Sequence, residues 1–349
     1  MNGLSQKNRW KQGKKAARYK ILILLLVLAS IFILSFNIGR YKGISLFDAA
    51  SIMLSHILPI KGSWPAEFEK VILYIRFPRI FSAVVVGGAL ALSGASYQTV
   101  FKNPLVSPDI LGASAGASLG AATAIFAGLH APFIQFFAFV FSLVAVWGAN
   151  FVGSRVKRDP TLALVLAGVF VSSFANAVVS LIKFLADPND KLPAITYWLM
   201  GSLANIKIGD IGWAFIPILA SSIPLLLFRW RLNVLSLGED EAKALGVETK
   251  RFRAIVIVCS TILTASAISI SGLIGWVGLV IPHLMRMAIG PNNIYLLPAS
   301  AISGGVFLLL VDDFARSVTV TEVPLGVLTA IIGAPFFIFL ILNERAGEK

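Results

Sequence analysis

The sequence has few of the residue types that build redox centres, metal sites or acid–base active sites. Its 349 residues include one cysteine, Cys259, which lies inside an apolar run, and three widely separated histidines. A disulfide or a thiolate metal cluster within one chain is therefore excluded, and we expect no metal site. A membrane enzyme is also disfavoured, because an active site needs several convergent polar groups.

A nucleotide-binding loop is missing as well. No G-x-x-x-x-G-K-[ST] motif occurs in the chain. The segment LSGAS at 92–96 is similar to the signature peptide of ATP-binding cassette ATPases, but it lies within an apolar stretch. Phosphate binding needs a solvent-exposed glycine loop at the start of a helix. Any ATP-driven process that involves this chain therefore needs a motor on another polypeptide.

Long apolar runs dominate what is present. Hydrophobic residues make up 57% of the chain, and the mean hydropathy is +0.84. Runs of about 20 apolar residues match the hydrocarbon thickness of a bilayer. The predicted fold class is therefore an all-α polytopic membrane protein, with residues 1–349 forming a single transmembrane domain. About ten spans are predicted, at 20–37, 74–101, 109–128, 132–153, 161–185, 210–229, 251–270, 272–289, 294–316 and 323–342.

Positive charge predicts the orientation of these spans. The chain has 30 Lys and Arg against 17 Asp and Glu, a net charge of +13. Most of the basic residues fall on the same predicted side as the basic tail at 1–20, so both termini are predicted to be cytoplasmic. Residues 186–209, which include Tyr197 and Trp198, are predicted to form an outer interfacial segment. Loop placement accounts for the positive charge, and no nucleic-acid partner is expected.

A charged segment at 233–249 interrupts the apolar pattern. It contains LSLGEDEAKALG (235–246) and predicts short polar helices flanked by basic residues. A chain that contacts only lipid has little use for such a segment. We therefore expect it to contact a soluble partner.

Small residues recur with helical spacing in the second and third predicted spans. Gly112, Gly116 and Gly120 follow one another every four residues, and Gly87 begins a similar stripe. Small side chains let helix backbones approach closely in lipid. Tight packing is the favoured interpretation, and a helix that lines a moving pathway is the alternative.

Pro282 and His283 lie within the predicted span 272–289. Proline lacks an N–H and clashes with the preceding turn, so we expect the helix to be broken or kinked there. His283 is interpreted as a hydrogen-bonded structural residue rather than a metal ligand or proton relay, since metal sites normally show clustered ligands.

Three arginines run against the predicted distribution of positive charge. Arg76 and Arg79 begin the second span at the outer face, and Arg316 ends the ninth at the same face. A planar guanidinium suits carboxylates, so docking of an acidic partner is one interpretation. Snorkelling at the membrane boundary is the other. The residues alone leave both open.

The inner loop KNPLVSPD at 102–109 joins the second and third spans. Pro104 stops one helix and Pro108 delays the next, while Asn103 can hydrogen-bond across the turn. The loop is either an inner constriction of a path or a rigid turn.

Four segments together resemble the FecCD-type permease subunits of type II ABC importers, which carry ferric siderophores, haem or cobalamin. They span about residues 70–342, namely RFPRIFSAVVVGGALALSGASYQTVFKNPLVSPDILGASAGASLG (76–120), LGEDEAKALGV (237–247), GLIGWVGLVIPHLMR (272–286) and EVPLGVLTAIIGAPFFIFLI (322–341). The resemblance implies a ten-helix bundle like the cobalamin permease, paired as a homodimer or with a second permease. It also implies two ABC ATPase subunits that bind ATP and Mg²⁺, and an extracytoplasmic substrate-binding protein.

The resemblance also implies roles for particular residues. Coupling helices at 233–249 would insert into the ATPase through Leu237, Gly238, Glu239, Ala242, Leu245 and Gly246. The outer arginines Arg76, Arg79 and Arg316 would bind glutamates of the substrate-binding protein. The inner gate would comprise Asn103, Pro104, Leu105 and Thr161.

The expected function is the permease subunit of an ATP-driven importer. It would carry an iron chelate, a ferric siderophore or haem, across a bacterial or archaeal cytoplasmic membrane by alternating access, with cobalamin as the alternative substrate. An ion-coupled secondary transporter is the rival, and it needs an intramembrane carboxylate for which Asp312 and Asp313 are candidates. No catalytic residue and no cofactor is expected in the chain itself.

Overall fold

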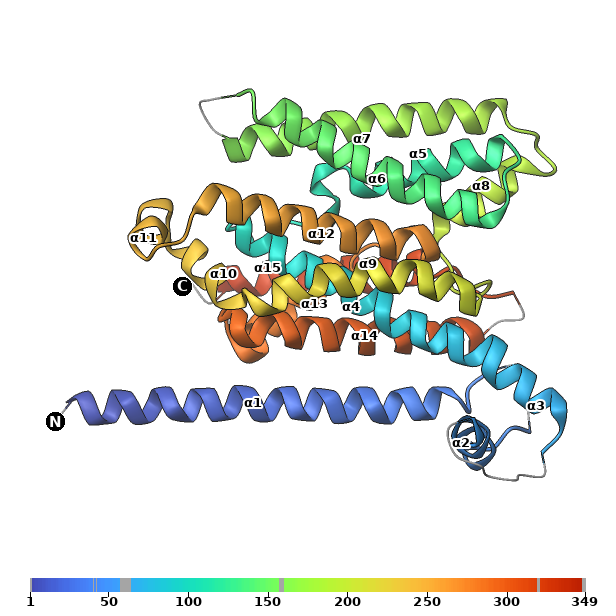
Figure 1. Cartoon of the computed structure of the whole chain (residues 1–349), viewed down its shortest axis with the longest axis horizontal. Helices are drawn as coiled ribbons and strands as arrows, with labels where there is room; N and C mark the ends of the chain where they lie inside the picture. The colour runs from blue at the N-terminus through green and yellow to red at the C-terminus, as the bar shows by residue number, and fades with distance from the viewer. Residues whose placement is uncertain are drawn as a thin grey trace.

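The described part of the chain is helical. A computed structural model describes residues 2–39, 41, 43–56, 64–156, 160–318 and 321–346, and within these it contains helices and no strand. Figure 1 shows long helices running side by side along one direction, with α1 lying against the edge of the bundle. The predicted all-α polytopic fold is confirmed.

Seven helical stretches are long and apolar enough to cross a membrane by length and composition. They are α1 (Asn2–Ser35), the continuous stretch Ala66–Val100, α6 (Ala131–Gly153), α7 (Pro160–Leu185), α9 (Ile208–Leu227), α12 (Thr249–Ser271) and α14 (Asn293–Val318). The remaining predicted spans are occupied by two shorter apolar helices, α5 (Ala113–Phe126) and α13 (Val277–Ile289), and by α15 (Leu325–Ala346), which is apolar over Leu325–Ile338. Within the described residues, each predicted span therefore overlaps a helix.

Several helix boundaries differ from the predicted ones. Helix α1 continues through the basic tail, because that tail lacks any proline. The second span begins earlier than predicted, as α3 (Ala66–Lys70) and the π-helical turn η1 (Val71–Arg76), and leads into α4 (Phe77–Val100). The third is delayed by the 3₁₀ turn η2 (Pro108–Leu111). A helix α8 (Lys191–Met200) lies in the predicted interfacial segment.

A short helix missed by the prediction, α2 (Leu46–Ser55), has a clear local cause. The Ser45 hydroxyl accepts from the Asp48 N–H at 3.1 Å, and the Ser45 N–H donates to Asp48 Oδ2 at 3.0 Å. This reciprocal capping box pairs two backbone groups that a helix start leaves open. The bonds from the Ser45 side chain and backbone also hold the pKa of Asp48 below its usual value.

Helix α4 lies at the centre of the bundle and packs against α12, α13 and α14. Glycines lie where α4 crosses α13 and α14, and they allow the backbones to approach closely. A Cβ at Gly87 would overlap the Gly304 carbonyl of α14, and a Cβ at Gly94 would overlap the Gly278 carbonyl of α13. Gly116 and Gly120 of α5 meet α6 in the same way. The small-residue stripes therefore serve close packing of helices.

The break near α13 lies earlier than predicted. Helix α13 is continuous through Pro282 and His283, whereas the chain is non-helical at 272–276, between α12 and α13. Pro282 lacks the N–H that would bond the Gly278 carbonyl, and that carbonyl faces Gly94. Two residues before α13 adopt positive φ, Gly272 (+66°) and Trp276 (+70°), and this turns the chain.

We predict that Gly94→Ala destabilises the fold by roughly 1–3 kcal/mol or more, because the added methyl group overlaps the backbone of α13. The matched control is Gly148→Ala in α6, where a Cβ meets nothing within 4 Å. The control is expected to be neutral or stabilising by up to about 1 kcal/mol, from helix propensity. Thermal unfolding in detergent measures both variants, and equal melting temperatures would contradict the assignment.

Candidate functional sites

Two short helices, α10 (Arg229–Leu237) and α11 (Glu239–Ala244), form a hairpin at one end of the bundle. Figure 1 shows α11 at the end where α1 begins. Leu232 and Leu235 are buried, and α10 packs on α4 and α14. These contacts fix the hairpin on the bundle.

Two leucine side chains are exposed on the surface of this hairpin. Leu237 and Leu245 are 62% and 58% exposed, whereas Ala242 between them is buried. Gly246 has a φ of +77°, which favours glycine, and it turns the chain toward α12. Gly238 is extended, and the Glu239 side chain lies outside the described part of the structure. The predicted coupling residues thus lie in and beside one hairpin, with Leu237 and Leu245 exposed and Ala242 buried, and their role stays a prediction.

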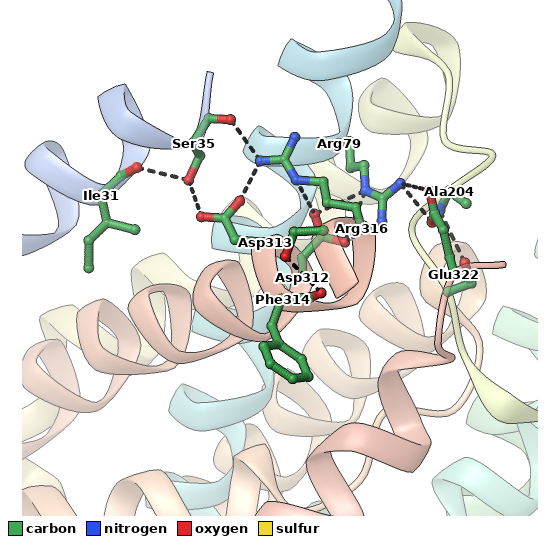
Figure 2. A network of polar contacts seen from close by, with 11 residues as sticks. Ile31, Ser35, Arg79, Ala204, Asp312, Asp313, Phe314, Arg316 and Glu322 are labelled. Atoms are coloured by element: carbon green, nitrogen blue, oxygen red, sulfur yellow. Dashed lines mark hydrogen bonds and ion pairs between the residues drawn. The ribbon is translucent and has the colours of Figure 1, made fainter. Parts of the chain in front are cut away.

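The three singled-out arginines line one cavity at the opposite end of the bundle, and Figure 2 shows two of them, Arg79 and Arg316. Arg79 of α4 binds Asp312 of α14 in a bidentate pair, with Nε 2.9 Å from Oδ2 and Nη2 2.8 Å from Oδ1. Its Nη1 lies 2.8 Å from Glu322 Oε2. Bidentate pairing is the strongest form of guanidinium–carboxylate contact. Arg79 therefore joins α4, α14 and the segment before α15.

Arg316 connects α14 to the end of α1. Its Nη2 contacts the Asp313 carboxylate and donates to the Ser35 carbonyl at 2.7 Å. The Ser35 hydroxyl donates to Asp313 Oδ2 at 2.6 Å. Arg76 donates to the carbonyls of Phe36 and Tyr41.

Burial distinguishes these arginines from snorkelling side chains. Arg76, Arg79 and Arg316 are 4%, 7% and 5% exposed. They line a cavity of about 230 Å³ with Tyr41 and Glu322. The arginines are therefore held inside the protein, and any contact with a partner would pass through this cavity.

The prediction identified the arginines but missed the carboxylates that pair with them. Asp312 and Asp313 precede Arg316 by four and three residues, a spacing that places opposite charges together on a helix. That spacing was readable from the sequence. Both acids lie near the end of α14 and contact arginines.

The loop after α4 is an ordered turn. Asn103 Oδ1 accepts from the Leu105 N–H at 2.9 Å, and the Asn103 N–H donates to the Gln98 carbonyl at 3.1 Å. Pro104 lies between Asn103 and Leu105, and the Leu105 side chain is exposed. Thr161 lies in the first turn of α7, and its side chain is outside the described part of the structure. A gating role for these residues stays a prediction.

His283 is buried in α13, while His56 of the α2 end pairs with Glu69 at 3.4 Å. Among the described residues, no three or more His, Cys, Asp or Glu side chains form a group that could hold a metal ion.

Comparison with known proteins identifies the family. The model of the FecCD transport family matches residues 22–343. The molybdate import system permease MolB of Haemophilus influenzae is 41% identical over 93% of this chain and 95% of its own length. The hemin transport system permease HmuU of Yersinia pestis is 38% identical over 78% of this chain and 83% of its own length.

A solved structure has the same fold. It is described as an inward-facing conformation of a metal-chelate type ABC transporter, and it is 39% identical to this chain. It superposes with a TM-score of 0.83 and covers 93% of this chain and 99% of the other. With the family match over most of the length and these relatives, the chain belongs to the FecCD transport family and is a membrane permease of an ABC importer.

Proposed function

We propose that this permease imports a metal chelate, with an iron chelate such as a ferric siderophore or haem ahead of cobalamin. Support comes from the likeness to the metal-chelate type transporter and from the hemin permease. Molybdate is the competing substrate, because the molybdate permease is at least as similar. The iron chelate is preferred because two Helicobacter pylori permeases described as probable iron chelatin transporters are 42% identical to this chain, and the hemin permease is 38% identical.

The observation that carries the transport mechanism is the exposed α10–α11 hairpin. Leu237 and Leu245 project from a backbone that is anchored on α4 and α14. An exposed apolar pair on an anchored element suits insertion into a groove of another protein. We therefore assign this surface to a separate ATPase subunit, whose closure would move the hairpin and open the two ends of the path in opposite phase.

This assignment also orients the molecule. The hairpin lies at the same end as the start of α1, which carries the basic tail (Figure 1). Basic segments stay in the cytoplasm, so the α10–α11 end would be inner and the arginine end outer. In a paired permease, the substrate-binding protein would then dock at the outer end. Its acidic side chains would reach the three arginines through the cavity beside Glu322.

The substrate proposal is tested in proteoliposomes. We expect uptake of labelled ferric siderophore or haem when the permease is reconstituted with its ATPase, binding protein and ATP. We expect no uptake by the chain alone under an imposed ion gradient. Uptake of molybdate by the full complex without uptake of either iron chelate would reject the proposal that the substrate is an iron chelate. Uptake by the chain alone would reject ATP-driven import.

The ATPase surface is tested by Leu237→Asp combined with Leu245→Asp. Both side chains are exposed, so the fold should persist while recovery of the ATPase with the permease falls by at least about tenfold, through lost apolar burial and added charge. Lys243→Ala is the matched control, because Lys243 is 59% exposed on the same hairpin. Co-purification from detergent extracts measures the effect, and equal recovery of both variants would argue against the assignment.

The docking site is tested by Arg76→Gln. Arg76 donates to backbone carbonyls, so its loss leaves no buried carboxylate without a partner, unlike loss of Arg79. We expect the binding protein to dock roughly tenfold or more weakly, while the permease stays folded and loses about 1–3 kcal/mol of stability through the freed carbonyls. Arg251→Gln at the opposite end is the control. Titration of the binding protein against the purified permease measures docking, and an unaltered affinity for Arg76→Gln would exclude this site.

A further inference from the structure

A pair of side-chain amides ties α10 to the start of α14. Asn233 lies in the middle of α10, and its Oδ1 accepts from the backbone N–H of Asn293 at 2.7 Å. Its Nδ2 donates to Asn292 Oδ1 at 2.9 Å. One side chain thus makes two directional bonds to the neighbouring helix, in addition to the apolar contacts of α10.

These bonds are part of the helix start itself. Asn292 Oδ1 also accepts from the Ile294 N–H at 3.0 Å, so Asn292 caps α14. The first N–H groups of a helix have no acceptor within it. Asn233 supplies the acceptor for Asn293, and a shift of α10 along α14 would leave that donor unpaired. The position of α10 is therefore coupled to the end of α14.

The connection continues into α4. Asn293 is buried, and its Oδ1 accepts from Thr99 Oγ1 at 3.0 Å. The Thr99 hydroxyl has one hydrogen, which it shares with the Ala95 carbonyl at 2.9 Å. The Thr99 carbonyl in turn accepts from the Lys102 N–H at 3.3 Å, at the first residue of the turn that contains Leu105.

We propose that Asn233, Asn292, Asn293 and Thr99 transmit movement of the α10–α11 hairpin to the turn after α4. This inference rests on the proposed function, in which an ATPase moves the hairpin. The buried leucines of α10 hold it against the bundle but fix no register, because apolar contact is non-directional. Hydrogen bonds weaken steeply with distance and angle. The amide bonds therefore fix the position of α10 along α14, so that movement of one helix is passed to the other. Asn233 is a positioning residue and contacts no substrate.

The test follows the turn directly and needs no substrate. In a Cys259→Ala background, Leu105→Cys is introduced and its maleimide labelling rate is measured in the complex of permease and co-purified ATPase. Rates are compared without nucleotide and with ATP–Mg²⁺ plus vanadate. We expect the nucleotide to change the rate when Asn233 is present. Asn233→Ala should reduce that change by roughly fivefold or more, the lower range of coupling between sites, while the complex stays folded and ATP hydrolysis persists.

Two controls separate transmission from packing. Asn292→Asp keeps both the acceptor for Asn233 Nδ2 and the cap of α14, so it should retain the full response. Ser236→Ala removes a hydroxyl that donates to the Asn233 carbonyl within α10, and it should also respond fully.

Three results would overturn the inference. A full response in Asn233→Ala would show that the amides transmit nothing. A parallel loss of response, ATP hydrolysis and melting temperature would assign them to stability alone. Failure of the unaltered chain to recover any ATPase would reject the proposed function, and the transmission role with it.

Discussion

The close approach of α4 and α14 is the constraint on which the rest of the structure depends. Lipid supplies no hydrophobic drive between helices, so their association relies on tight contact of backbones and small side chains. Gly87 and Gly304 provide that contact, since a Cβ at either would overlap the other's backbone. Because the two helices run in opposite directions, the start of α4 lies beside the end of α14, and the end of α4 lies beside the start of α14.

The two ends of the α4–α14 pair are joined by different kinds of contact. At one end, Arg79 of α4 binds Asp312 of α14, and at the other Thr99 of α4 binds Asn293 of α14. The first link is ionic and buried, and it is surrounded by further pairs that reach α1 and the segment before α15 (Figure 2). The second is made of neutral groups and continues to α10. Neutral bonds cost less to rearrange than a buried ion pair, which suits the end that is proposed to move.

The proline of α13 shows how context reverses a local preference. Pro282 removes a helical bond, yet α13 continues through it, and the carbonyl that it frees, that of Gly278, faces Gly94 of α4. The chain instead leaves the helix at 272–276, where α8 and the start of α15 come close. Beside it, the Ser202 N–H donates to the Ser271 carbonyl at the end of α12, and the Leu325 N–H donates to the Gly201 carbonyl, so the flanking segments are bonded to one another. Irregular backbone is tolerated in such a protein only where other segments satisfy its polar groups.

The sequence by itself determined the helical class, the positions of the apolar spans, the polar hairpin and the family. Each of these depends on local composition, on the length of apolar runs or on motifs of contiguous residues such as LGEDEAKALG. The cap of α2 and the spacing of Asp312 and Asp313 from Arg316 were equally local, although the prediction did not use them.

Only the tertiary structure decided that Arg76, Arg79 and Arg316 are buried. It also decided that Arg79 pairs with Asp312, which lies 233 residues later in the chain, and that Asn233 bonds the start of α14. Such pairs are fixed by which helices cross and at what depth. Periodicity along one segment carries no information about that geometry, because it is set by small-residue contacts between segments far apart in the chain.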